Sequence, residues 1–134
     1  MIVYHFAGEV ECNTFEDVEK ILQIRTKEFA NGFTLPEEAN TFTLCGENNF
    51  PFMIMMVKSD IASLYIVLEE GDAGYVSIDS LEEDKSGITI FYADNGEKVE
   101  VLNCYCLSFS KALSVCKEFF ETMCLPKCID WEKL

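Results

Sequence analysis

The chain has 134 residues, of which 49% are hydrophobic, 13% aromatic and 25% charged, and its formal net charge at pH 7 is -14. This length and composition suit one hydrophobic core, so we expect a single domain over residues 1–134. No apolar run approaches the ~20 residues of a membrane span, and the N-terminus lacks a signal-peptide pattern, which predicts a cytoplasmic protein. The acidic balance argues against nucleic acid and membrane as partners and favours a basic protein.

The first third of the chain predicts a strand, a helix and a second strand. We expect a strand over residues 2–6. Asn13 or Thr14 can cap a helix, with Glu16 as a capping-box partner of Asn13. Apolar residues at helical spacing extend this helix through Phe29, and Asn31-Gly32 ends it, because glycine accepts the left-handed conformation. A polar loop over residues 35–40 precedes a short strand over residues 41–45.

The middle of the chain predicts a series of hairpins. Residues 52–57 and 62–68 read as apolar strands joined by the tight turn Lys58-Ser59-Asp60, and their near-continuous hydrophobicity predicts central strands covered on both faces. A further strand is expected over residues 75–78. Residues 88–92 and 98–102 flank Asp94-Asn95-Gly96, in which Asn-Gly is the strongest short hairpin signal. Residues 104–107 extend the last strand.

The C-terminal segment predicts a capped amphipathic helix followed by a strand. Ser108 or Ser110 can act as the N-cap, and Pro126 cannot continue the helix. Trp131 lies in the alternating strand that follows. The apolar helix face consists of Ala112, Val115, Cys116, Phe119, Phe120 and Met123. Together these elements predict an α+β fold, with an antiparallel, mostly meandering sheet packed by an N-terminal and a C-terminal helix.

This C-terminal segment resembles a signature of the type-one immunity proteins of bacterial polymorphic toxin and contact-dependent growth inhibition systems. The matching residues are Lys111-Ala112-Leu113, Glu118-Phe119-Phe120-Glu121-Thr122, Leu125-Pro126 and Ile129-Asp130-Trp131-Glu132. The structural signature residues are Phe119, Phe120, Pro126 and Trp131. A weaker match covers residues 62–67 and 74–77, and Met123 stands where the family often has glycine. The resemblance implies an antitoxin that binds one cognate toxin C-terminal domain, typically a nuclease or nucleic-acid deaminase.

Acidic residues in turn-like segments are the candidate contacts of such a partner. The primary candidates are Glu69, Glu70, Asp72, Asp79, Glu82, Glu83 and Asp84. The secondary candidates are Glu37, Glu38 and Glu47. These acids can equally be a solvated surface, but a basic toxin cleft that normally binds phosphates would be attracted to them. Trp131 is expected to close the core beneath the C-terminal helix; an anchor at the partner interface is the alternative.

No pattern in the chain predicts catalysis, a metal or a cofactor. The seven cysteines are an odd number within apolar patterns and are expected as free thiols. The alternative is a zinc site at Cys104, Cys106, Cys124 and Cys128, although these spacings are not those of a zinc finger. His5 is the only imidazole, so a nucleophile–base pair is not expected. An antitoxin and a generic intracellular binding or regulatory domain both remain open, as a monomer or a weak homodimer.

Overall fold

The computed structural model describes residues 1–5, 8–24, 39–79, 86–93 and 96–134. The described chain consists of short strands and two α-helices. In chain order the elements are β1 (Ile2–His5), β2 (Gly8–Glu11), α1 (Phe15–Leu22), β3 (Ala39–Cys45), β4 (Phe52–Lys58), β5 (Ile61–Val67), β6 (Tyr75–Ile78), β7 (Ile88–Tyr92), β8 (Lys98–Leu102), the 3-10 helix η1 (Asn103–Tyr105), β9 (Cys106–Ser108), α2 (Phe109–Thr122) and β10 (Asp130–Lys133).

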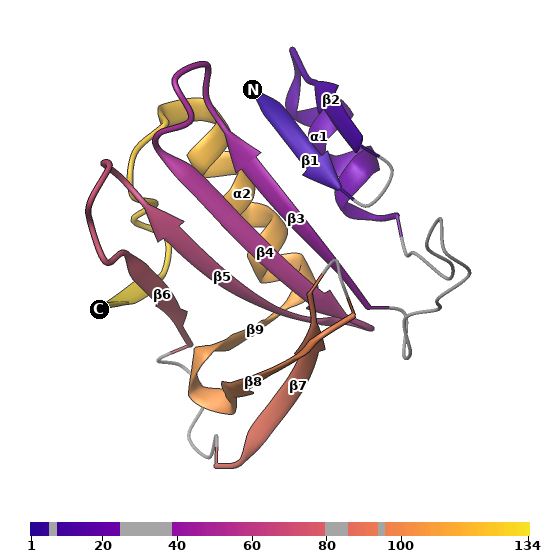
Figure 1. Cartoon of the computed structure of the whole chain (residues 1–134), viewed down its shortest axis with the longest axis vertical. Helices are drawn as coiled ribbons and strands as arrows, with labels where there is room; N and C mark the ends of the chain where they lie inside the picture. Colours follow the sequence, from indigo (N-terminus) through magenta and orange to yellow (C-terminus); the bar gives the residue numbers. More distant parts are fainter. Residues whose placement is uncertain (6–7, 25–38, 80–85, 94–95) are drawn as a thin grey trace.

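Eight of the described strands form one antiparallel sheet, in the order β10-β6-β5-β4-β3-β1-β2, with β9 also paired to β5. Strands β3 to β6 form a meander, the β1–β2 hairpin extends the sheet beyond β3, and β10 borders β6 (Figure 1). Strands β7 and β8 form a separate hairpin, and β7 contacts β3 and β4. The predicted α+β fold, with a mostly meandering antiparallel sheet and a helix from each end of the chain, is confirmed.

Helix α2 packs its apolar side against the sheet and lies behind β3, β4 and β5 in Figure 1. Ser108 caps the helix, because its hydroxyl accepts a hydrogen bond from the backbone N–H of Lys111 at 3.2 Å. The buried helix residues recur at helical spacing and are Ala112, Val115, Cys116 and Phe119. The Cys116 sulfur lies 3.8 Å from the sulfur of Met53 and 3.9 Å from that of Met55. The core is therefore built between α2 and the centre of the sheet.

The signature residues of the C-terminal segment all have packing roles. Phe119 is fully buried, and the Phe120 ring lies 6.1 Å from the ring of Phe15, which joins α2 to α1. Pro126 is buried. The indole N–H of Trp131 donates to the carbonyl of Pro126 at 2.8 Å while its ring packs against the core. Trp131 thus lies against the core, as predicted.

Met123 ends α2 in the left-handed conformation that glycine usually supplies. Its φ is 52° and its ψ is 32°, and its N–H donates to the carbonyl of Phe119 at 2.8 Å. A residue with a Cβ in this conformation costs roughly 1 kcal/mol relative to glycine. The helix therefore ends at the position expected from the resemblance, although the residue there is not glycine.

Strands β9 and β6 pair with successive parts of the same edge of β5. Two serine hydroxyls form hydrogen bonds at the junction between these two strands. The backbone N–H of Leu64 faces this junction and donates to the Ser77 hydroxyl at 3.1 Å. The hydroxyls of Ser77 and Ser63 both donate to the carbonyl of Tyr105, at 3.0 and 2.9 Å. Because both serines are buried, these bonds replace the ladder bonds that the junction lacks.

The predicted hairpins agree with the structure. Lys58 pairs with Ile61 across a two-residue turn in which Ser59 has a φ of 52°, as primed hairpin turns require. Strands β6, β7 and β8 have the predicted bounds. Asn95 of the predicted Asn-Gly turn lies outside the described residues.

The N-terminal region differs from the prediction in three ways. Of the two predicted N-caps, Thr14 is confirmed, because its hydroxyl accepts from the N–H of Asp17 at 3.2 Å, and the capping box of Asn13 with Glu16 is wrong. The helix ends at Leu22 instead of continuing to Phe29. Strand β2 was not predicted, because its sequence Gly-Glu-Val-Glu is fully exposed and carries no apolar run. Residues 25–38 lie outside the described part of the chain.

Candidate functional site

One face of the sheet faces away from α2 and is apolar. Along β4 the side chains of Met53, Met55 and Val57 are fully buried on the α2 side. The alternate side chains, Phe52, Ile54 and Met56, point to the opposite face and are only half-buried. The prediction that β4 and β5 are covered on both faces is therefore wrong for the second face of β4, whereas Ser63 and Val67 of β5 are buried on that face. The β7–β8 hairpin covers one end of it, where the Thr41 hydroxyl donates to the carbonyl of Tyr92 at 2.7 Å.

A single cross-strand row runs across the uncovered part of this face and has a carboxylate at each end. The strand registers align Glu9, Tyr4, Thr43, Ile54, Tyr65, Val76 and Glu132 from β2 to β10. We call the five central residues, together with Phe52, the open face. Six steps between strands of about 4.8 Å each give the row a length of about 29 Å. The row thus has an uncharged centre between two acidic ends.

Aromatic rings and a small hollow lie at the end of the open face next to the β3–β4 turn. The rings of Phe50 and Phe52 lie 5.5 Å apart at an interplanar angle of 53°. A hollow of ≈ 240 Å³ is lined by Tyr4, Thr43, Cys45, Asn49 and Phe52. Burial raises the pKa of the Cys45 thiol. Desolvation, followed by the charges of Cys45 and Glu9, raises the pKa of Tyr4. Both groups are therefore protonated and neutral at pH 7.

The acidic turn between β5 and β6 is fixed to the end of the open face. Glu69, Glu70 and Asp72, three of the primary candidates, are exposed there. The hydroxyl of Tyr65 donates to the carbonyl of Ala73 at 2.5 Å. Gly74 has a φ of 97°, and a Cβ at this position would lie 2.6 Å from the Tyr65 ring. The turn is thus held against an aromatic residue of the open face.

Glu47, a secondary candidate, lies at the same end of the sheet as the acidic turn. It belongs to the turn between β3 and β4, in which the N–H of Asn49 donates to the carbonyl of Gly46 at 3.2 Å. Figure 1 shows both connections, β3–β4 and β5–β6, at the same end of the strands. The topology therefore brings together acids that are separated along the chain.

The remaining acidic candidates are not part of this grouping. The Asp79 carboxylate is 5% exposed and forms an ion pair with the Lys111 ammonium of α2 at 3.2 Å. This contact links β6 to the first turn of α2 and leaves little of Asp79 for a partner. The candidates outside the described residues are Glu37, Glu38, Glu82, Glu83 and Asp84.

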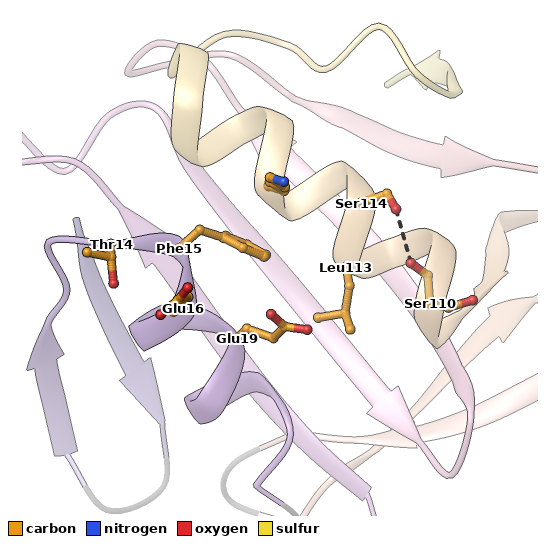
Figure 2. Close-up of a pocket in the computed structure, with 8 residues that line it drawn as sticks. Thr14, Phe15, Glu16, Glu19, Ser110, Leu113 and Ser114 are labelled. Atoms are coloured by element: carbon orange, nitrogen blue, oxygen red, sulfur yellow. Dashed lines mark hydrogen bonds between the residues drawn. The ribbon is translucent and has the colours of Figure 1, made fainter.

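A larger hollow lies elsewhere, between α1 and α2. It has a volume of ≈ 720 Å³ and is lined by Thr14, Phe15, Glu16, Glu19, Ser110, Leu113, Ser114 and Lys117. Figure 2 shows Phe15 pointing toward α2 and Leu113 pointing toward Glu19 of α1. The Ser114 hydroxyl donates back to the carbonyl of Ser110 at 3.3 Å. The lining of this hollow combines acidic, basic, hydroxyl and apolar groups.

The cysteines do not assemble into a site in the described part of the chain. Cys106 is buried, Cys104 lies in η1 and not in a strand, and Cys124 and Cys128 are exposed. The prediction that residues 104–107 extend the last strand is therefore wrong for Cys104, which lies in η1. Among the described residues, no three His, Cys, Asp or Glu side chains are grouped to hold a metal. Neither α1 nor α2 is long and apolar enough to cross a membrane.

Sequence reasoning missed the two carboxylates at the ends of the row. Glu9 lies in the unpredicted β2, and Glu132 was treated as the solvent-facing residue of the terminal strand. Glu9 and Glu11 are two residues apart, as side chains on one face of a strand are. This spacing was the signal in the sequence that could have indicated the strand. The alignment with Tyr4 and Val76 required the register between strands.

Comparison with known proteins gives one whole-length similarity. No protein-family model matches the chain. The chain is 26% identical over 130 residues to the double-stranded DNA deaminase immunity protein of Burkholderia cenocepacia (strain H111). The alignment covers 96% of this chain and 96% of that protein. Over nearly its full length, the chain is therefore similar to an immunity protein.

Proposed function

We propose that the protein is an immunity protein, which binds a cognate toxin domain and inhibits it. The observation that carries the proposal is the similarity to a double-stranded DNA deaminase immunity protein over 96% of both chains. The C-terminal signature Phe119, Phe120, Pro126 and Trp131 supports the same assignment. An inhibitor of this kind acts by occupying a surface, so it needs no catalytic group of its own.

The charge of this protein fits a toxin that acts on nucleic acid, and the name of its relative favours a deaminase among such toxins. An enzyme that acts on DNA presents basic side chains to phosphates, and the net charge of -14 attracts such a surface. Exposed carboxylates such as Glu69, Glu70 and Asp72 can occupy phosphate-binding positions and exclude the substrate. The mechanism is then occlusion of the basic active site, and the protein acts in the cytoplasm, where the DNA is.

The proposed function expects a toxin gene beside the gene of this protein, and co-expression of the two tests it. The C-terminal domain encoded beside this gene is expressed in a bacterial host with and without the protein, and survival and base substitutions in the host DNA are counted. We expect the protein to restore survival and to return the substitution frequency to background. A catalytically inactive toxin domain is the control for general toxicity of expression.

Two results would contradict the proposal. One is the absence of a toxin domain beside the gene, which favours a generic binding or regulatory domain. The other is cell death and base substitution at the same rate with and without the protein.

A further inference from the structure

We propose that the open face and its acidic border form the surface that docks the toxin domain. The partner surface then has an apolar centre flanked by basic side chains. This inference rests on the proposed function and specifies which surface performs it.

The first support is the composition and size of the face. Tyr4, Phe52 and Tyr65 are accessible aromatic residues on a rigid sheet, and Tyr4 is 38% exposed. Aromatic anchors near the centre of an interface carry most of the binding energy. A standard interface covers about 800 Å² on each partner, which corresponds to a patch about 32 Å across. The row of about 29 Å matches this width.

The second support is the charge of the border. Glu9 and Glu132 end the row on opposite edges of the sheet, and Glu132 is exposed although it accepts a hydrogen bond from the Tyr105 hydroxyl. Glu69, Glu70 and Asp72 lie in the turn that contacts Tyr65. The row and the turn over residues 68–74 contain no lysine or arginine. Lys133, the neighbour of Glu132, points to the opposite face of the sheet. Charge complementarity therefore selects a partner with basic residues around an apolar patch.

The hollow between α1 and α2 fits such a partner less well. Its border includes Lys117 as well as Glu16 and Glu19, so a basic partner meets charges of both signs there. The row itself carries charges of one sign only; the lysine on the same face of β4 is Lys58, four residues from Ile54. Because the two surfaces differ in charge, variants that change one of them can show which surface binds the partner.

The test measures binding of the purified adjacent-gene toxin domain to matched variants. Ile54→Arg places a cation at the centre of the open face, and Leu102→Arg makes the same change on β8, where Leu102 is 51% exposed. We expect Ile54→Arg to weaken binding by about 100-fold, mainly through faster dissociation, and Leu102→Arg to leave it unchanged. Circular dichroism checks folding, and Ile54→Ala, expected to weaken binding about 10-fold, replaces Ile54→Arg if that variant does not fold.

A second pair of variants isolates the acidic border. Glu9→Gln with Glu132→Gln removes two charges from the row and keeps amide oxygens as hydrogen-bond acceptors. Glu16→Gln with Glu121→Gln changes the total charge equally, from -14 to -12, at exposed helix positions. We expect the first pair to slow association about 3- to 10-fold at low salt, with the difference disappearing at high salt. The second pair should associate at nearly the wild-type rate.

The outcomes distinguish this inference from the proposed function. A wild-type protein that does not bind the toxin refutes both. If the wild type binds and both Ile54 variants bind within about 3-fold of it, the docking surface is elsewhere while the function stands. Light scattering tests whether a second copy of the protein covers the open face instead of the toxin. A homodimer that Ile54→Arg converts to monomers would show that it does.

Discussion

The substitution Ser77→Ala tests the junction between β6 and β9. Ser77 is fully buried, and its hydroxyl accepts from the N–H of Leu64 and donates to the carbonyl of Tyr105. In the variant the carbonyl keeps its bond from Ser63, but the Leu64 N–H faces a strand junction without an acceptor. A buried donor without a partner costs about 1–3 kcal/mol. For a chain of this length, that corresponds to a melting temperature lower by roughly 3–10 °C.

Ser63→Ala is the matched control, because it removes only one of two bonds to the Tyr105 carbonyl. It should cost about 0.5–1 kcal/mol. Urea unfolding measures both variants, and hydrogen exchange of the Leu64 amide should accelerate only in Ser77→Ala. Equal losses in the two variants, or unchanged exchange at Leu64, would refute the assignment of the Leu64 bond.

Two further predictions concern the turn at the open face and the core thiol. Gly74→Ala should lower the free energy of unfolding about 1–3 kcal/mol more than Gly71→Ala. Both glycines have positive φ, but only at position 74 would a Cβ press against Tyr65. Equal decreases in the free energy of unfolding, measured with urea, would contradict this contact. Burial raises the pKa of Cys116 from 9.0 to about 12, so the folded protein keeps a thiol that the unfolded chain ionises. The contribution of the protonated Cys116 thiol to stability is intact below pH 9 and declines as the pH rises from 9 to 12. Between pH 9 and 10.5 the free energy of unfolding should fall by about 1 kcal/mol per pH unit more in the wild type than in Cys116→Val. Parallel profiles would show that Cys116 is not protected.

Local chemistry predicted the turns and caps of this fold well. The tight connection at Ser59, the Ser108 cap and the strands on either side of Asn95-Gly96 follow from residues within a few positions of one another. The end of α1 was wrong because apolar spacing continues beyond Leu22 although the helix does not. Periodicity describes a possible helix face, and only packing decides how much of it forms.

The candidate site required information that is not local. Residues 52–57 are apolar at nearly every position, so the sequence pattern could not show that Met53 and Met55 lie under α2 while Phe52 and Ile54 do not. The acidic turn was identified from charge alone, but its position beside the open face depends on the contact between Tyr65 and Gly74. Asp79 looked equivalent to its acidic neighbours until its contact with Lys111 was known.

The pairing of distant segments has a consequence for how the protein is produced. Strand β5 receives β9, and β6 receives β10, only after residues 106–108 and 130–133 have been made. Contacts between residues far apart in sequence slow folding, because a long loop must close before they form. A ribosome adds about 5–20 residues per second, so these last strands follow β5 by several seconds. A translation product that stops before residue 130 lacks the partner of β6 and the Trp131 contact with Pro126. The outer edge of β6 is therefore completed only when translation continues through β10.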